Sequence, residues 1–149
     1  MSIFQVLISN PIINSAFMGW FLAQLWKFLY HLIFKKECNF AYFISSGGMP
    51  SSHSSLVMAL TVCIFRIYGF LSAEFAISLA FSAIVMYDAS GVRRAAGEQA
   101  KIINQIVEVL KEEDFEVVGK KLKEILGHSP IEVMVGALLG IVVGWVMPI

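Results

Sequence analysis

Long apolar segments alternate with short polar ones along this chain, and the apolar segments approach the length that crosses a bilayer. A membrane-spanning helix needs about 20 predominantly apolar residues. Four segments fit this description: 12–34, 53–71, 73–92 and 131–148. The polar turn "RIYGFLSAE" joins the second and third segments as an antiparallel hairpin, and a charged insert, residues 93–128, precedes the fourth. The pattern predicts one all-α domain, residues 1–149: a membrane helical bundle with about four spanning helices.

The charged insert has a hydrophobic pattern of its own. Apolar residues recur at helical spacing in two runs, 103–110 and 115–126. The acidic stretch "KEEDFE" between them indicates a break, and Asp114 is a suitable N-cap for the second run. We expect one or two short amphipathic helices that lie on the membrane face or on the bundle. A solvated linker with incidental apolar residues is the simpler alternative.

Composition supports a membrane environment. The chain is 58% hydrophobic and 15% charged, whereas soluble domains are about 45–50% apolar and about 25% charged. Its net charge is zero and no basic patch stands apart from acidic neighbours, so nucleic-acid binding has no support. Cys38 and Cys63 are expected to be free thiols, because a linker residue and a residue deep in a span lie too far apart to pair.

Most of the lysines and arginines follow the first and third spans. Basic residues near span ends favour the cytoplasmic side. We therefore expect a multi-pass protein of the cell (plasma) membrane whose motif-bearing loops are cytoplasmic and whose termini are outside. The end of the first span, the start of the second, the end of the third and the start of the fourth then meet at one face, where the polar residues are also concentrated.

The first span carries three polar residues on one helical stripe: Gln24, Lys27 and His31. A charge inside a span is costly and usually faces a polar interior. The stripe therefore indicates that Lys27 reaches into a shared polar site. The alternative is that Lys27, two turns from the end of the span, extends to the interface.

The stretch "GGMPSSHSS" precedes the second span. Its glycines, Gly48 among them, permit a sharp turn, and its proline suits a helix start. Ser51 or Ser52 is then placed to cap the helix. A helix N-terminus attracts anions, so with His53 this stretch has the groups needed to hold a phosphate and protonate a leaving group. A well-capped span with an interfacial histidine is the alternative.

The third span ends in "YDASGVRRAAGEQA". Asp88 is expected to be buried near the membrane face, where a carboxylate needs a cationic partner such as Lys27 or an arginine. Arg93 and Arg94 offer forked donors that match phosphate oxygens. Anchoring by positive charge explains the arginines equally simply.

The fourth span begins with "GHSPIEVMVG". Ser129 and Glu132 form a capping box around a proline at the first helical position. That box leaves His128 unexplained. A histidine four residues before a carboxylate is also the arrangement of a nucleophile and the group that orients it. The sequence leaves both uses of Glu132 open.

Taken in order, "GGMPSSHS", "YDASGVRRAAGEQA" and "GHSPIEVMVG" resemble the divergent branch of the type 2 phosphatidic acid phosphatases, which is related to acid phosphatases and vanadium-dependent haloperoxidases. The resemblance extends from Gln24 to Gly140. It implies a phosphatase that acts through a phosphohistidine and needs no metal or other cofactor. The chain departs from the parent pattern where Ser52 replaces a glycine and Glu132 replaces an aspartate. The arginines also lie 34 or more residues before His128.

The resemblance also implies a role for each matching residue. His128 becomes the nucleophile, Glu132 the residue that orients it, and His53 the general acid. Ser51, Lys27 and an arginine become ligands of the phosphate. The remaining candidates, which support or bind the phosphate, are Gln24, Gly48, Ser52, Asp88, Arg93 and Arg94.

The expected function is hydrolysis of a lipid phosphate or diphosphate, so the expected partner is a phosphorylated membrane lipid. With four spans the chain is shorter than the six-helix family core, so a homodimer, or the insert folding back, would complete the site. The alternative function is a catalytically inactive protein that binds a phosphorylated lipid or acts as a scaffold.

Overall fold

The computed structural model describes residues 9–36, 47–112, 122 and 127–149. These residues form five α-helices and no strand, which confirms the predicted all-α class. The helices are α2 (Pro11–Phe34), α4 (Ser52–Tyr68), α5 (Ala73–Ser90), α6 (Val92–Glu112) and α7 (Pro130–Val146). The helix bounds differ by only a few residues from the predicted spans.

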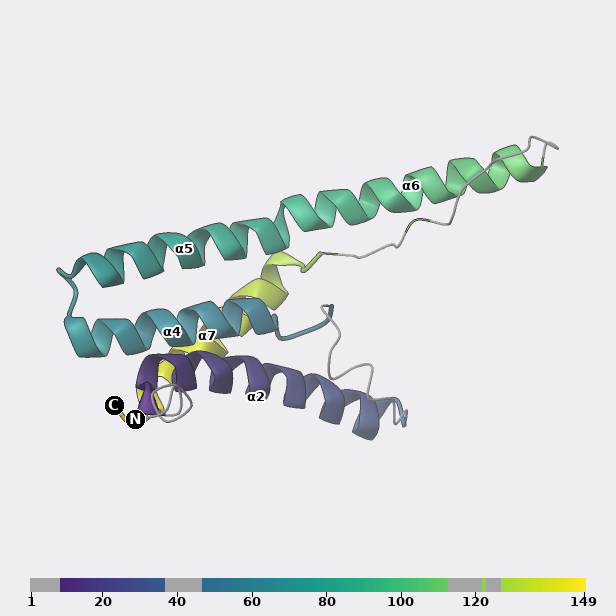
Figure 1. Cartoon of the computed structure of the whole chain (residues 1–149). Coiled ribbons are helices and arrows are strands. Elements are labelled where there is room, and N and C mark those ends of the chain that lie inside the picture. The colour runs from purple at the N-terminus through teal and green to yellow at the C-terminus, as the bar shows by residue number, and fades with distance from the viewer. Residues whose placement is uncertain (1–8, 37–46, 113–121, 123–126) are drawn as a thin grey trace.

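Helix α4 lies at the centre of the bundle and packs against α7, α2 and α5, while α2 also contacts α7 (Figure 1). Helices α2 and α5 end, and helices α4 and α7 begin, at the same end of the bundle. Residues 27–34, 51–53, 88–93 and 128–132 therefore gather at one end of the bundle, which we call the motif end. The start of α2 and the end of α7 lie at the other end.

Small residues let the α7 backbone approach the α4 backbone. A Cβ added at Gly136 would overlap the carbonyl oxygen of Ser51, and one added at Gly140 would overlap that of Ser55. One turn farther along, a Cβ at Gly144 would lie 2.7 Å from the carbonyl oxygen of Ala59. Glycines spaced four apart allow this contact between helices without intervening side chains. The three glycines of α7 therefore fix where α4 lies along α7.

Hydroxyl groups join α4 to its other two neighbours. The Ser55 hydroxyl donates to the Gly19 carbonyl of α2 at 2.8 Å. On the opposite side, Thr61 Oγ1 and Ser82 Oγ of α5 lie 2.8 Å apart and share a hydrogen bond. Hydroxyl hydrogen bonds between helices are typical of packing in membrane bundles, where apolar contact gives little preference for one helix neighbour over lipid.

Large apolar side chains point outward instead of into a core. The buried apolar residues are small or medium in size, such as Ala23, Ala59 and Val57, whereas Phe17, Ile84 and many other large residues are exposed. A soluble domain places most of its large apolar residues inside. This distribution suits a bundle surrounded by hydrocarbon.

Length and composition mark one helical segment among the described residues, Ala73–Leu110, as a candidate membrane span. Helices α4 and α7 are apolar but have 17 residues each, about 26 Å at 1.5 Å per residue. A hydrocarbon core is about 30 Å thick. The topology with four spans therefore remains a prediction.

The insert was expected to form one or two short amphipathic helices, whereas its described part forms one longer helix that does not pack on the bundle. Helix α6 has 21 residues and, among the described helices, contacts only α5. It continues the line of α5 past the motif end (Figure 1). The backbone ladder continues through Gly91, which donates to Tyr87 and accepts from Ala95, so the chain does not turn there.

The segment of 38 residues formed by α5 and most of α6 is about 57 Å long. Only part of it fits within a bilayer. The expected second helix and its cap, Asp114, lie outside the described residues, as does Cys38. Leu122 is described, and its backbone exchanges two hydrogen bonds of 2.8 and 2.9 Å with the Asn104 side chain of α6.

Replacing Gly140 with alanine should destabilise the protein. The new Cβ overlaps the Ser55 carbonyl and lies 2.9 Å from Met58 Cβ, so the helices must separate. We expect the free energy of unfolding in detergent to fall by about 2 kcal/mol, although alanine favours a helix over glycine by about 1 kcal/mol.

Gly47→Ala is the matched control for this change, because nothing lies within 4 Å of a Cβ at Gly47. A Gly140→Ala protein as stable as this control in thermal denaturation would show that the contact between α4 and α7 is looser than described.

Candidate functional site

The polar stripe on α2 faces the interior at the motif end. Gln24 and Lys27 are each only 3% exposed, and His31 is half-buried. Lys27 therefore does not extend to the surface. A Cβ at Gly19, two turns before Lys27, would lie 2.8 Å from the Ser55 carbonyl oxygen, so α2 packs closely enough on α4 to carry the stripe inward.

Ser51 caps α4, which decides between the two serines proposed for this role. Its side chain accepts hydrogen bonds from the backbone N–H and the hydroxyl of Ser54. The Ser51 N–H donates to the Glu132 carbonyl of α7 at 3.0 Å. Ser52 Oγ is buried and has no hydrogen-bond partner among the described residues. The hydroxyl of Ser52, more than that of Ser51, is available to a ligand.

Glu132 serves both of the uses that the sequence left open. Its Oε2 accepts from the Ser129 N–H at 3.1 Å, which completes the capping box, and lies 3.0 Å from His128 Nδ1. One carboxylate oxygen thus caps α7 and orients the imidazole. His128 is 5% exposed, and its Nε2 has no hydrogen-bond partner in the described part of the chain. The two ring nitrogens therefore differ: one is anchored and the other is free.

Two backbone contacts that the sequence did not predict hold His128 in place. Its N–H donates to the Ala89 carbonyl near the end of α5 at 3.0 Å. Immediately before it, a Cβ at Gly127 would overlap the backbone nitrogen of Arg94. The only sequence signal for this contact was the glycine in "GHSP". These contacts tie the start of α7 to the junction of α5 and α6.

The two arginines have different surroundings. Arg93 Nε lies 2.6 Å from Asp88 Oδ2, so Asp88 has the cationic partner that its position required. Asp88 was expected to be buried, but its side chain is 37% exposed because α5 packs only one face on the bundle. Arg94 pairs instead with Glu98, one turn along α6, at 3.1 Å. Arg93 is therefore the arginine associated with the site.

Charged and titratable groups from every part of the motif end converge on His53. Lys27, Asp88, Arg93 and His128 all lie within electrostatic reach of its imidazole, and Glu132 lies within reach of Lys27. We call these six residues the His128 cluster. They come from α2, α4, α5, α6 and the start of α7, so a single chain brings them together.

A pocket of about 340 Å³ opens beside the cluster, between α2 and the turn that precedes α4. Lys27, His31 and Lys35 contribute positive or titratable groups to its lining. Gly48 contributes bare backbone in a left-handed conformation, with φ of 83°, which favours glycine. The complete lining is Trp26, Lys27, Tyr30, His31, Lys35, Gly47, Gly48 and Met49.

Within the described residues, no group of three or more His, Cys, Asp and Glu side chains is placed to hold a metal ion. The cluster instead has an oriented imidazole, a second imidazole, two cationic side chains and a capped helix start. Nucleophilic attack on an anionic, tetrahedral group is the chemistry that such groups can support.

The fold and the site thus define a helical bundle that carries a histidine–carboxylate pair and cationic groups at one end. Comparison with known proteins agrees with the sequence resemblance: the chain belongs to the divergent PAP2 family, whose family model matches residues 8–143. It is 40% identical over 151 residues to the uncharacterized membrane protein YuiD of Bacillus subtilis (strain 168), covering 95% of this chain and 96% of that protein. No solved structure matches.

Ser129→Ala should separate the two uses of Glu132. The change removes the hydroxyl that accepts from the Glu132 N–H at 3.3 Å, and loss of such a cap costs about 1 kcal/mol of stability. The bond between His128 and the Glu132 carboxylate does not involve that hydroxyl. We therefore expect reduced stability in chemical denaturation and an unchanged His128 tautomer in nitrogen NMR.

Ser129→Thr, which keeps a capping hydroxyl, serves as the control and should restore the stability. A changed tautomer in Ser129→Ala would contradict the prediction, because Glu132 would then need the cap to hold the imidazole.

Proposed function

We propose that this protein is an integral-membrane phosphatase that hydrolyses a lipid phosphate or diphosphate through a phosphohistidine intermediate. The observation that supports it most is the His128 imidazole, anchored through Nδ1 and free at a buried Nε2. Membership of the divergent PAP2 family and the description of the similar YuiD as a membrane protein support the class and the location.

His128 acts as the nucleophile in the proposed first step. With the proton on Nδ1, held by Glu132 Oε2, the lone pair of Nε2 attacks phosphorus. The bond between phosphorus and the leaving oxygen breaks as the nitrogen–phosphorus bond forms. The Glu132 carboxylate stabilises the positive charge that develops on the imidazole.

His53 acts as the general acid and then as the general base. It donates a proton to the departing oxygen, so that a lipid phosphate releases an alcohol instead of an alkoxide, and a diphosphate releases a protonated lipid phosphate. In the second step the same nitrogen takes a proton from water, which attacks the phosphohistidine and releases inorganic phosphate. This step frees His128 Nε2 and returns the proton to His53.

The cationic groups hold the phosphoryl oxygens during both steps. Lys27 and Arg93 supply positive charge, and the start of α4 supplies unpaired N–H groups together with the Ser52 hydroxyl. Phosphoryl transfer depends mainly on such positioning and charge stabilisation. Gln24 and Asp88 support the site by lying beside Lys27 and pairing with Arg93, respectively.

We place the motif end on the cytoplasmic side of the cell membrane. The basic residues at this end include Lys35, Lys36, Arg93 and Arg94. Basic residues near span ends favour the cytoplasmic side. A substrate whose phosphate is at the interface then keeps its hydrocarbon in the bilayer. Dimerisation remains an additional proposal.

His128→Ala should abolish phosphate release by purified protein from a panel of phosphatidic acid, phosphatidylglycerol phosphate and a prenyl diphosphate. The nucleophile is lost, while the backbone bond from residue 128 to Ala89 can remain. The wild type should release phosphate in the presence of a chelator and form an acid-labile phosphoprotein.

A thermal denaturation midpoint close to that of the wild type will show that this variant is folded. Equal turnover by the variant would reject the proposed nucleophile. A folded wild type that binds these lipids without releasing phosphate would favour the alternative, a binding protein.

Arg93→Ala and Arg94→Ala form a matched pair of neighbouring substitutions. Arg93 lies within electrostatic reach of His53, whereas Arg94 pairs with Glu98 on the surface of α6. Removing Arg93 should lower kcat/KM by about tenfold or more, as expected for a group that stabilises transition-state charge. Removing Arg94 should change it less than about twofold. Equal losses of kcat/KM in the two variants would mean that Arg93 and Arg94 contribute only nonspecific positive charge.

A further inference from the structure

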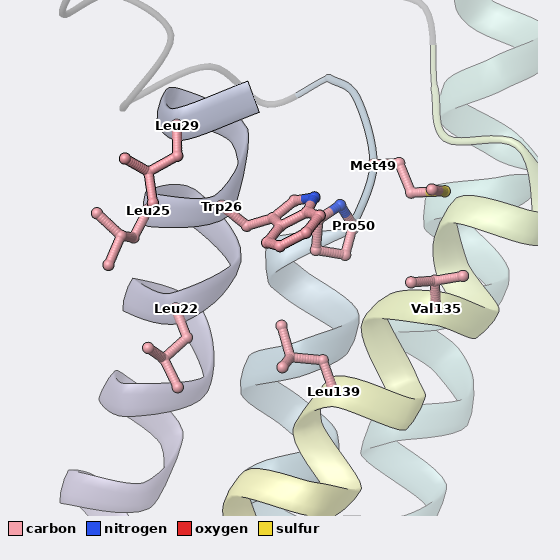
Figure 2. Close-up of a pocket in the computed structure, with 8 residues that line it drawn as sticks. All are labelled: Leu22, Leu25, Trp26, Leu29, Met49, Pro50, Val135 and Leu139. Atoms are coloured by element: carbon pink, nitrogen blue, oxygen red, sulfur yellow. The ribbon is translucent and has the colours of Figure 1, made fainter. Parts of the chain in front are cut away.

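A second hollow, apolar and of about 370 Å³, lies between α2 and α7. Figure 2 shows Trp26 reaching from α2 toward Pro50 at the start of α4, with Leu139 of α7 facing the same space. Leu22 and Val135 belong to its walls as well. All eight lining residues are apolar, so this groove offers nothing to a phosphate or to any other polar ligand.

The groove and the cationic pocket share part of their walls. Trp26 and Met49 line both hollows. Lys27 and Lys35 lie in the pocket on one side of this shared wall. The groove on the other side is lined by apolar side chains. A ligand that fills both hollows must therefore be anionic at one end and apolar at the other.

The direction of the groove matches an amphiphile embedded in a membrane. On α2 it runs from Leu29 back to Leu22, about 10 Å farther from the motif end at 1.5 Å per residue. On α7, which begins at the motif end, Leu139 lies one turn deeper than Val135. In the membrane placement proposed above, the charged pocket lies at the level of the lipid head groups, and the groove leads from there toward the middle of the bilayer.

We propose that the groove holds one hydrocarbon chain of the phosphorylated lipid, while its anionic head occupies the pocket beside Lys27. This proposal rests on the proposed function and assigns Trp26, Val135 and Leu139 to substrate recognition. Lipid hydrocarbon is as apolar as these side chains, so the groove contributes orientation more than affinity. By holding the chain, it aligns the phosphate with the His128 cluster.

Photolabelling tests this assignment without requiring turnover. The probe is a phosphatidic acid with a diazirine in one chain, added to phosphatidylcholine vesicles that contain the protein. We expect labels on the α2 and α7 peptides that line the groove. Leu139→Trp, which fills the groove, should lower this labelling at least about fivefold.

Leu138→Trp is the matched control, because Leu138 is next in the chain but 60% exposed and not part of the groove. It should label like the wild type. If Leu139→Trp fails to fold, Val135→Phe narrows the same space and Met134→Phe, also outside the groove, is its control. Labels spread over the exposed faces, or unaffected by filling the groove, would overturn the proposal.

A comparison of two probes tests whether the negative charge of the lipid head group directs the chain into the groove. The same diazirine chain on a phosphatidylcholine head should label the groove less than the phosphatidic acid probe, and Lys35→Ala should reduce the difference between the two probes. Equal labelling by both probes in the wild type would overturn the link between pocket and groove.

Hydrolysis assays separate this proposal from the proposed function. Leu139→Trp should lower kcat/KM for phosphatidic acid at least about tenfold and leave that for butyl phosphate, which has no long chain, within about twofold. Equal effects on both substrates, without groove labelling, would reject the groove and leave the phosphatase intact. Groove labelling in a protein that releases no phosphate from either substrate would reject the phosphatase and leave the groove.

Discussion

Contact between helix backbones is the constraint on which the rest of this structure depends. The α7 glycines lie against the backbone of α4, where a single added Cβ at Gly136 would meet the Ser51 carbonyl. Gly19 brings α2 against α4 in the same way. Because no long side chain separates these helices, their positions along one another are set by backbone geometry. The ends that carry the polar motifs are consequently held at a common level.

This constraint also explains why the interior is polar and the surface apolar. Helices that approach so closely leave room only for small side chains, and serine and threonine satisfy their hydroxyls on neighbouring backbones, as Ser55 does on Gly19. Large apolar residues are then displaced outward, where hydrocarbon surrounds them. The same crowding places Ser52 and His128 out of contact with solvent. A phosphate that enters there would meet the Ser52 hydroxyl and the His128 imidazole, which Glu132 already orients.

Glu132 illustrates how a structural and a chemical role can depend on the same atom. Its Oε2 accepts from the Ser129 N–H and lies within hydrogen-bond distance of His128. A carboxylate oxygen accepts more than one hydrogen bond, so neither interaction excludes the other. The side chain that helps to cap the start of α7 is therefore also the one that selects which imidazole nitrogen is free. The replacement of an aspartate by Glu132 in the family pattern is compatible with this geometry, because the capping box itself calls for a glutamate at this position.

The sequence by itself determined the helical class, the approximate helix bounds and the family, because apolar runs, caps and short motifs are local features. It also selected His128, Glu132 and Lys27, since a charge or a histidine at the edge of an apolar run is costly without a purpose. Only the tertiary structure decided between alternatives that depend on distant neighbours. Arg93 and Arg94 are adjacent in sequence, yet only Arg93 pairs with Asp88.

Two other features of the structure could not be predicted from the sequence, because local sequence does not specify them. The hydrogen bond from the His128 N–H to the Ala89 carbonyl involves two backbone groups, which have no sequence signature. Helix α6 does not lie on the bundle, one of the two placements expected for the insert, because the hydrogen-bond ladder through Gly91 keeps the helix in line with α5. Glycine permits a turn but does not require one, so the local sequence left this direction open, and only the structure shows that the hydrogen-bond ladder continues through Gly91.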